Sequence, residues 1–451
     1  MSSFSAVALA LALAQAPQQA APAAKAAGAP ATVITLDEAL RLASERNLDL
    51  KVLRARLDQA DEISWKAWAR YLPQVTGTGA WIRQKEAIFP LAVDVTAGPP
   101  PELVFAQVPV QAEEVWQGQL EASQMLFSPA LIFGIRAAMK SEEVASLQLG
   151  DGRRALLFGV ASAYYAAAAL KQALGVSERL LENAQRQEKD ARVSFQAGTV
   201  AKVGLLRAEI DRARAEQDLK RARNTFESAR LALGTLLDRP PDFDVTDPPS
   251  PPLPESPDPE VLVRDALGKR PDVKAARLQI GAARATRNAA VGRYLPNVAA
   301  FGRVSRADQA GLSGSAENWA AGLQLQWQIL DGGLRESDIR EGNARIREAE
   351  AASQSTEAKA REEVLKALLD LDSARANAVK AKEQRDLAAE NLRLVDVSYR
   401  AGAATAVELA DATAALRTAE AGATAEGLAA QLAALRVLQV TGEFEPFVRR
   451  R

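Results

Sequence analysis

The chain has 451 residues, with 56 Lys and Arg against 57 Asp and Glu, and it contains neither Cys nor His. The near-zero net charge gives no field that would attract nucleic acid, and the missing residue types exclude disulfides, thiolate or imidazole metal sites and His-based catalytic triads. Composition therefore favours a structural or transport protein over an enzyme, and no cofactor is expected.

The amino terminus is typical of an exported protein. Residues 1–14 contain an apolar run ending in Ala12-Leu13-Ala14, as in a signal peptide, although no Lys or Arg precedes it. An Ala-rich tail is the alternative. Residues 15–34, rich in Ala, Pro and Gln, are predicted to form a flexible leader. No later segment reaches the ~18–20 apolar residues of a membrane helix, so any membrane crossing has to use strands.

The next segments alternate between helical and strand periodicity. Thr35–Ala69 is predicted to be one helix that starts with a Thr-x-x-Glu capping box and ends before Pro73. Strands follow at 74–83 and 115–127, and a long loop is predicted for 88–107 between them.

A very long helix follows the second strand. The helical pattern runs from 129 to 196, which at 1.5 Å per residue is on the order of 100 Å. Such a helix has to belong to a bundle or coiled coil. A turn at 197–199 leads to another helix over 200–237, and the Pro-rich residues 238–260 are predicted to form a linker.

The second half of the chain repeats the first. Three anchors recur in the same order, at offsets of 223, 203 and 204: Arg70–Val75 as Arg293–Val298, Leu126–Pro129 as Ile329–Gly332, and Val193–Gly198 as Val397–Gly402. This order indicates an internal duplication. The first repeat covers 35–237 and the second 261–443, with strands at about 297–305 and 318–330, and 444–451 form a tail.

The strand at 318–330 has two different faces. Its apolar face carries Trp319, Ala321, Leu323, Leu325, Trp327 and Ile329, and the other face carries Gln324, Gln326 and Gln328. This pattern suits a wall between lipid and water. An edge strand of a soluble sandwich is the alternative for this strand alone.

Four strands cannot close a barrel, and open strand edges are not tolerated in lipid. Symmetry completes the sheet most simply, with twelve strands from three chains, and the long helices then form a second cylinder coaxial with the barrel. The predicted fold is therefore mostly α, with a transmembrane β part.

Residues 35–443 resemble the TolC family of outer membrane factors. The duplicated Tyr-Leu-Pro start of the strands, the Leu-Asp-Gly-Gly segment at 330–333 and the aromatic-x-x-Gly turns carry this resemblance. It implies a homotrimer with a 12-stranded β-barrel in the outer membrane and an α-helical barrel in the periplasm. The function implied is a passive exit duct of a tripartite efflux pump or type I secretion system, with a periplasmic adaptor and an inner-membrane pump (RND, ABC or MFS type) as partners.

The resemblance also assigns roles to individual residues. The tips that would meet the adaptor are Phe195, Ala197, Gly198, Thr199, Ala401, Gly402 and Ala403, where members often carry Val before the Gly. Gly198 and Gly402 are predicted to adopt the left-handed conformation that ends each helix. Many members carry a lipidated N-terminal Cys, which this chain lacks.

An acidic pair follows the second tip. Glu408 and Asp411 lie on one helix face, and Gly204 and Arg207 stand at their positions in the first repeat. The resemblance matches the pair to an acidic constriction ring, which would favour cations. A solvated helix face is the alternative. Tyr399 is expected either to hold the mouth closed or to pack in the helix seam.

Four tryptophans are candidates for an aromatic girdle at the membrane surfaces: Trp81, Trp116, Trp319 and Trp327. Core packing is the alternative for each. For the whole chain, the rival function is a soluble periplasmic coiled-coil scaffold or adaptor, and a hydrolase is a distant third.

Overall fold

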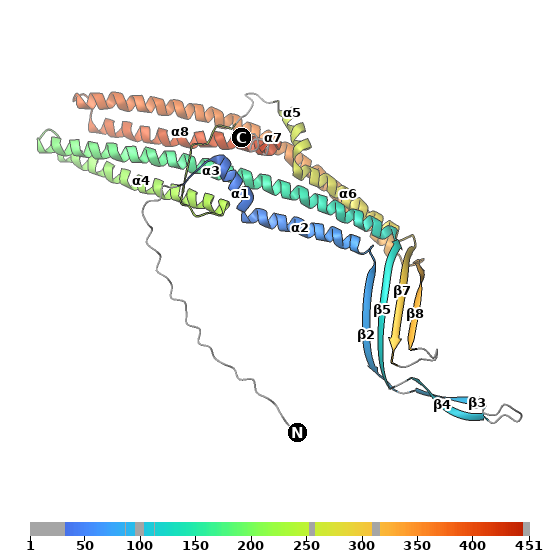
Figure 1. The fold of residues 1–451 in the computed structure, drawn as a ribbon. Coiled ribbons are helices and arrows are strands. Elements are labelled where there is room, and N and C mark those ends of the chain that lie inside the picture. Colours follow the sequence, from blue (N-terminus) through green and yellow to red (C-terminus); the bar gives the residue numbers. More distant parts are fainter. Residues whose placement is uncertain are drawn as a thin grey trace, which may run out of the picture.

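The structure is a computed structural model that describes residues 32–85, 87–94, 103–111, 113–251, 258–308 and 316–444. These residues form a row of long helices that continues at one end into a narrow sheet, and the helical turns farthest from the sheet lie at the opposite end (Figure 1). Within the described ranges, no helix combines the length and apolar character needed to span a membrane.

Two long helices, one from each half of the chain, run the length of the row. α3 (Pro129–Gln196) has 68 residues, as predicted, and α7 (Leu334–Arg400) has 67. α3 starts sharply because the Ser128 side chain accepts the N–H of Leu131 and Pro129 occupies the first turn. The shorter helices pack along these two: α2 (Leu48–Ala69) on α3, α6 (Pro271–Gly292) between α3 and α7, α4 (Lys202–Leu237) on α3, and α8 (Ala406–Thr441) between α3 and α7.

The sheet joins the two halves of the chain. Its four strands are β2 (Gln74–Arg83), β5 (Glu114–Phe127), β7 (Asn297–Ala307) and β8 (Glu317–Gln326). Their order is β2-β5-β7-β8, and every neighbouring pair is antiparallel. β2 and β8 are therefore the free edges of the sheet.

A compact core surrounds the middle of α3. β1 (Thr32–Ile34) pairs in parallel with β6 (Phe243–Val245), and α1 (Leu36–Arg46) packs on α3 beside them. The buried Tyr164 hydroxyl donates to the carbonyl of Ile34 at 2.7 Å, and Phe444 is fully buried in the same cluster. The start, the middle and the end of the described chain are thus held together at one level of the helix row.

The single helix predicted for Thr35–Ala69 is broken in two. Asn47 separates α1 from α2: its Oδ1 accepts the N–H of Leu50 at 3.1 Å, and its Nδ2 donates to the carbonyl of Leu236 at 2.9 Å. An N-cap of this kind starts a new helix and turns the chain. In the second repeat, α5 (Pro259–Lys269) and α6 are divided at the equivalent residue, Arg270, which makes no side-chain cap hydrogen bond.

Several predicted boundaries are wrong. The leader was expected to run through 34, but residues 32–34 form β1. The linker at 238–260 contains β6 and the first residues of α5, and the predicted tail begins with the buried Phe444. β1, β6 and Phe444 gain their structure from the core on α3, whereas α5 packs on α7. The signal peptide at 1–14, the leader up to 31, linker residues 252–257 and the tail from 445 lie outside the described residues.

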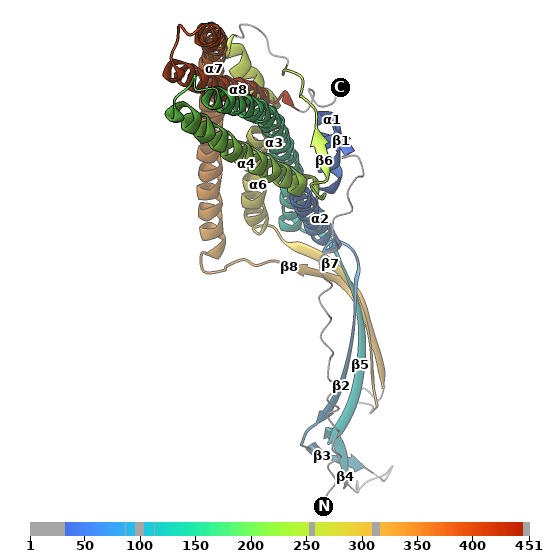
Figure 2. The same ribbon diagram turned by 90° about the vertical axis from the view of Figure 1, so that its left-hand side faces the viewer.

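The loop predicted for 88–107 is a hairpin of two strands. β3 (Ala87–Asp94) pairs antiparallel with β4 (Leu103–Gln111), and the hairpin extends past the end of the four-stranded sheet (Figure 2). The strand predicted for 318–330 ends early, at Gln326, and residues 327–330 are irregular.

Candidate functional site

The sheet is apolar on one face and polar on the other. The strand register places the apolar set together: Val75 and Trp81 in β2, Trp116, Leu120 and Ala122 in β5, Val298, Ala300 and Val304 in β7, and Trp319, Ala321, Leu323 and Leu325 in β8. The opposite face carries Thr76, Thr78, Gln117, Gln119, Glu121, Arg303, Ser305, Gln324 and Gln326. The pattern predicted for one strand therefore extends across all four.

The apolar face is uncovered in the single chain. Trp319 is 80% exposed, Leu323 71% and Leu325 64%. Exposed groups of this size indicate contact with another apolar phase. The mixture of apolar outward and polar inward positions is that of a barrel between lipid and water.

The four predicted girdle tryptophans lie at two levels of the sheet. Trp81 and Trp116 are directly opposite each other near its distal end, with ring centroids 6.3 Å apart, and Trp319 lies two strands away at the same end. Trp327 follows the other end of β8. Eight residues separate Trp319 from Trp327, which is about 26 Å along an extended chain, or roughly 20 Å along the membrane normal at the ~40° tilt of barrel strands, somewhat less than their ~25 Å apolar band.

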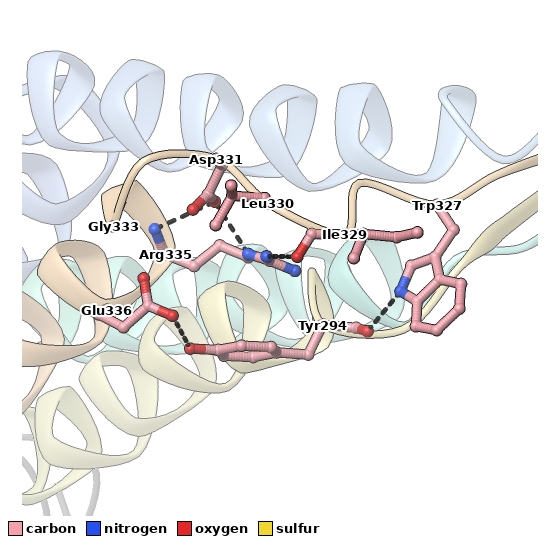
Figure 3. Close-up of a pocket in the computed structure, with 8 residues that line it drawn as sticks. All are labelled: Tyr294, Trp327, Ile329, Leu330, Asp331, Gly333, Arg335 and Glu336. Atoms are coloured by element: carbon pink, nitrogen blue, oxygen red, sulfur yellow. Dashed lines mark hydrogen bonds and ion pairs between the residues drawn. The ribbon is translucent and has the colours of Figure 1, made fainter.

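A pocket lies where the sheet passes into α7 (Figure 3), with a volume of about 340 Å³. Its lining residues are Tyr294, Trp327, Ile329, Leu330, Asp331, Gly333, Arg335 and Glu336. Trp327 Nε1 donates to the carbonyl of Tyr294 at 3.0 Å, which fixes the chain just after β8.

Arg335 is the centre of this junction. Its Nε lies 2.8 Å from Asp331 Oδ2, and both side chains are almost fully buried. Arg335 Nη2 also donates to the carbonyl of Ile329 at 2.9 Å, and the guanidinium stacks 4.5 Å from the Tyr294 ring centroid. Tyr294 Oη in turn donates to Glu336 at 2.6 Å. Arg335 lies two residues beyond the Leu330–Gly333 motif and was not predicted from the sequence.

The predicted adaptor-docking residues lie at the end of the helix row farthest from the sheet. Gly198 and Gly402 both have φ of +76°, as predicted, and each donates its N–H back to the helix before it. Phe195 is 39% exposed, and the remaining members of the set are exposed as well: Ala197, Thr199, Ala401 and Ala403. Tyr399 is half-buried, three residues before Gly402.

The structure gives Glu408 a further role. Thr405 Oγ1 accepts the N–H of Glu408 at 3.3 Å, and Glu408 Oε2 accepts the N–H of Thr405 at 2.6 Å. This reciprocal capping box starts α8. The hydrogen bond from the Thr405 backbone lowers the pKa of Glu408 below its usual value. Asp411 is exposed almost one turn later. The Thr-x-x-Glu spacing was visible in the sequence, but the capping role was missed.

A family model described as outer membrane efflux protein matches residues 39–239 and again 262–443. These two segments cover most of the chain. The chain belongs to the outer membrane efflux protein family.

Relatives of known name agree with this assignment. The chain is 24% identical over 363 residues to the outer membrane efflux protein BepC of Brucella suis, covering 80% of this chain and 74% of that protein. It is 22% identical over 380 residues to nodulation protein T of Rhizobium leguminosarum, covering 81% and 76%. The crystal structure of CusC superposes with a TM-score of 0.75 at 18% identity, covering 90% of this chain and 92% of that one.

As an outer membrane efflux protein, the chain is a non-enzymatic channel with helices extending into the periplasm. This confirms the predicted function class and location over a soluble scaffold or a hydrolase. The two matched segments correspond to the two halves in which the sequence repeats.

Proposed function

We propose that three copies of this outer membrane efflux protein close into one tube, which conducts substrates from the periplasm to the exterior after an adaptor and an inner-membrane pump dock. The unpaired edges of the sheet carry this proposal. β2 and β8 each leave a row of backbone N–H and C=O groups without partners, a state that lipid does not tolerate. Pairing β8 of one copy with β2 of the next removes every edge.

The helices support the same closure. The row ends in α7 on one side and in α2 and α4 on the other. The half of α7 nearer the tips exposes a stripe of large hydrophobic residues: Leu369, Val379, Leu387, Leu394 and Val397. α4 exposes a matching set: Val203, Leu206, Ile210 and Leu231. Both stripes have members near the tips and further members closer to the sheet, so each can bury the other between neighbouring copies.

The exposed tips and the acidic pair complete the proposed duct. The two left-handed turns would present short, exposed loops to the adaptor hairpins, and Glu408 and Asp411 would form a ring of six carboxylates around the threefold axis. Such a ring favours cations and repels anions. Energy for transport would come from the inner-membrane partner, with this chain a passive conduit.

The absence of Cys makes a direct test possible. One cysteine is introduced in β2 at Thr76 and a second in β8, at each residue from Leu323 to Gln326 in turn. Within one chain, β2 and β8 are separated by two other strands, about 14 Å at ~4.8 Å per strand, which is too far for a disulfide. The proposal expects covalent trimers at one or two β8 positions in the outer membrane.

Single-cysteine variants serve as the control, because they can form only dimers. Monomers at every position, or an open-ended ladder of larger species, would exclude the closed trimer.

A further inference from the structure

The last two turns of α2 expose a pair of tryptophans outside the predicted girdle. Trp65 and Trp68 are 59% and 45% exposed, and their i, i+3 spacing places them on the same side of the helix. α2 ends at Ala69 and β2 begins at Gln74. The Cα atoms of both tryptophans therefore lie within about 6 Å of the end of the helix along its axis, close to the level where the helices meet the sheet.

The second repeat shows that packing does not require tryptophan here. At the offset of 223 that aligns the two halves, Trp65 corresponds to Asn288 and Trp68 to Val291, near the end of α6. α6 leads into β7 as α2 leads into β2. The same helix-to-strand connection is thus built without an aromatic side chain at these two positions, so the tryptophans of α2 point to a contact outside the single chain.

A neighbouring copy offers these rings little apolar surface. In the proposed ring, the half of α7 nearer the sheet would lie beside α2. Leu334, at the sheet end of α7, is 58% exposed, and from there to Leu369 α7 exposes no further large hydrophobic side chain. Its exposed residues there are mostly charged or small, in contrast to the apolar stripe in the half of α7 nearer the tips.

Lipid headgroups fit the pair better. The apolar face of the sheet, which meets the membrane, begins directly beyond α2, and tryptophan prefers the headgroup level because its ring is apolar and its N–H is polar. From Asp58 onward the charges of α2 change sign towards the sheet, although Lys51, Arg54 and Arg56 are basic at its far end. Lys66 and Arg70 lie at the membrane end of α2, whereas the acidic Asp58, Asp61 and Glu62 lie farther away. Basic groups at this level attract lipid phosphates.

We propose that the end of α2 is a second membrane contact, in which the Trp65 and Trp68 indoles insert at the headgroup level of the periplasmic leaflet. This inference rests on the membrane position used in the proposed function. Three such pairs, one per copy, would fix the height of the tube in the membrane from the helical side, at the level of Trp327.

Depth-resolved fluorescence quenching tests this contact. A reporter protein in which Trp81, Trp116, Trp319 and Trp327 are changed to Phe keeps only the α2 pair. It is reconstituted in phosphatidylethanolamine and phosphatidylglycerol vesicles that contain either a headgroup spin-labelled lipid or a lipid brominated deep in the acyl chain. Because interfacial tryptophan stays at the headgroup level, headgroup quenching should exceed deep quenching by about twofold or more, and aqueous iodide should quench weakly.

The matched variant W65N/W68V carries the residues of the second repeat and keeps the four sheet tryptophans, so it reports insertion. If the Phe reporter does not insert, the difference in quenching between the unaltered protein and W65N/W68V gives the same quantity. With W65N/W68V quenched by lipid, strong iodide quenching of the α2 pair would overturn the contact, and so would quenching by neither agent, which indicates cover by a second copy. No lipid quenching of W65N/W68V would instead refute the membrane-spanning tube itself.

Discussion

The two helical hairpins that reach the periplasmic tips share one plan but are held together differently. In the α3–α4 hairpin, Glu188 accepts ion pairs from Arg192 at 2.5 Å and from Arg212 at 2.6 Å, and its side chain is only 12% exposed. Arg192 also reaches Glu209 on α4, at 3.4 Å. Among the ion pairs of the described residues, none joins α7 to α8. α8 is instead rich in alanine and packs closely along α7.

The α3–α4 hairpin is therefore held by ion pairs between its own helices, whereas the described residues give α8 such a pair only with α4, the exposed contact of Arg417 with Asp218 at 3.3 Å. Charged pairs between α3 and α4 fix their register, because a shift would break bonds that are partly shielded from water. Packing between small side chains does not fix the register of two helices in this way. The α7–α8 hairpin is also the one that carries Glu408 and Asp411. We therefore expect movement at the mouth to occur in α7–α8, with α3–α4 as the fixed frame.

The largest expected effect comes from a comparison of the starts of the two long helices, α7 and α3. Arg335→Met leaves the Asp331 carboxylate buried without its partner, at a cost of about 3–5 kcal/mol in the free energy of unfolding. The equivalent of Asp331 in the first repeat is Ser128, so Ser128→Ala is the matched control and should cost only ~1 kcal/mol. Guanidinium unfolding in detergent, followed by circular dichroism, measures both. Equal losses would show that the Arg335 junction adds nothing to a simple helix cap.

The helix breaks provide the second comparison. Arg270 Nη2 lies 2.7 Å from Asp272 and its Nη1 lies 2.8 Å from Glu363 on α7, whereas Asn47 at the same place in the first repeat is an N-cap. Because Asp272 is partly exposed, Arg270→Ala should lose about 2–3 kcal/mol, below the full cost for a buried pair, and Asn47→Ala should lose ~1 kcal/mol. The same unfolding assay ranks them.

This network also has a pH signature. Burial alone would raise the pKa of Asp272, but the hydrogen bonds and charge of Arg270 outweigh it and hold the pKa below its usual value. The stabilisation is therefore present above the carboxyl's ordinary pKa and is lost as pH falls through the lowered one. The stability difference between the unaltered protein and Arg270→Ala should shrink in acid. A constant difference down to pH 2 would contradict the role of the Asp272 charge.

A third variant removes the ion pairs of Glu188 that help to join α3 to α4 in the first hairpin. Glu188→Gln keeps the shape of the side chain but removes the charge that Arg192 and Arg212 share, and should cost about 1–2 kcal/mol. Hydrogen exchange should become faster near the α3–α4 tip and stay unchanged in α7–α8. Arg400→Gln is the control, because its partner Asp396 lies on the same exposed helix and the loss should stay below ~0.5 kcal/mol. Equal acceleration in both hairpins would mean that they move as one body.

The smallest effect on stability is expected at the acidic pair, where the readout is ion selectivity. Glu408→Gln keeps both halves of the capping box, since glutamine also serves at this position. Combined with Asp411→Asn, it should weaken cation preference in planar bilayers without lowering stability, whereas Glu408→Ala should also cost ~1 kcal/mol. Unchanged selectivity would remove the pair from the pore.

The Thr405 backbone N–H lowers the pKa of Glu408, and this predicts how cation selectivity should depend on pH. The carboxylate stays charged, and the cap intact, down to its ordinary pKa, and both are lost only as pH falls through the lowered value. Cation preference should therefore persist at pH 5. If selectivity is already lost between pH 7 and 5, repulsion within a ring of carboxylates outweighs the cap.

Sequence periodicity predicted the long elements well, because each repeats one signal many times. The 68 residues of α3, the four sheet strands and the left-handed Gly198 and Gly402 were found where expected, except that β8 ends at Gln326 rather than at 330. The duplication supplied a second reading of most elements. It also contained an unused signal: Pro271 follows Arg270 in the second repeat, and this break corresponds to the one at Asn47 that was missed.

What the sequence by itself determined was the set of elements, their order and the two-faced character of the strands, since these follow from local patterns of apolar and polar residues. Tertiary structure alone decided the short strands β1 and β6, the burial of Phe444 and the Arg335 junction. Three-residue strands have no periodicity to read, and a buried arginine is recognised only by the carbonyls and carboxylate that surround it. The carboxylate of Asp331 and the carbonyl of Ile329 lie four and six residues before Arg335, but the Tyr294 ring comes from the end of another helix, so only the folded arrangement completes the junction.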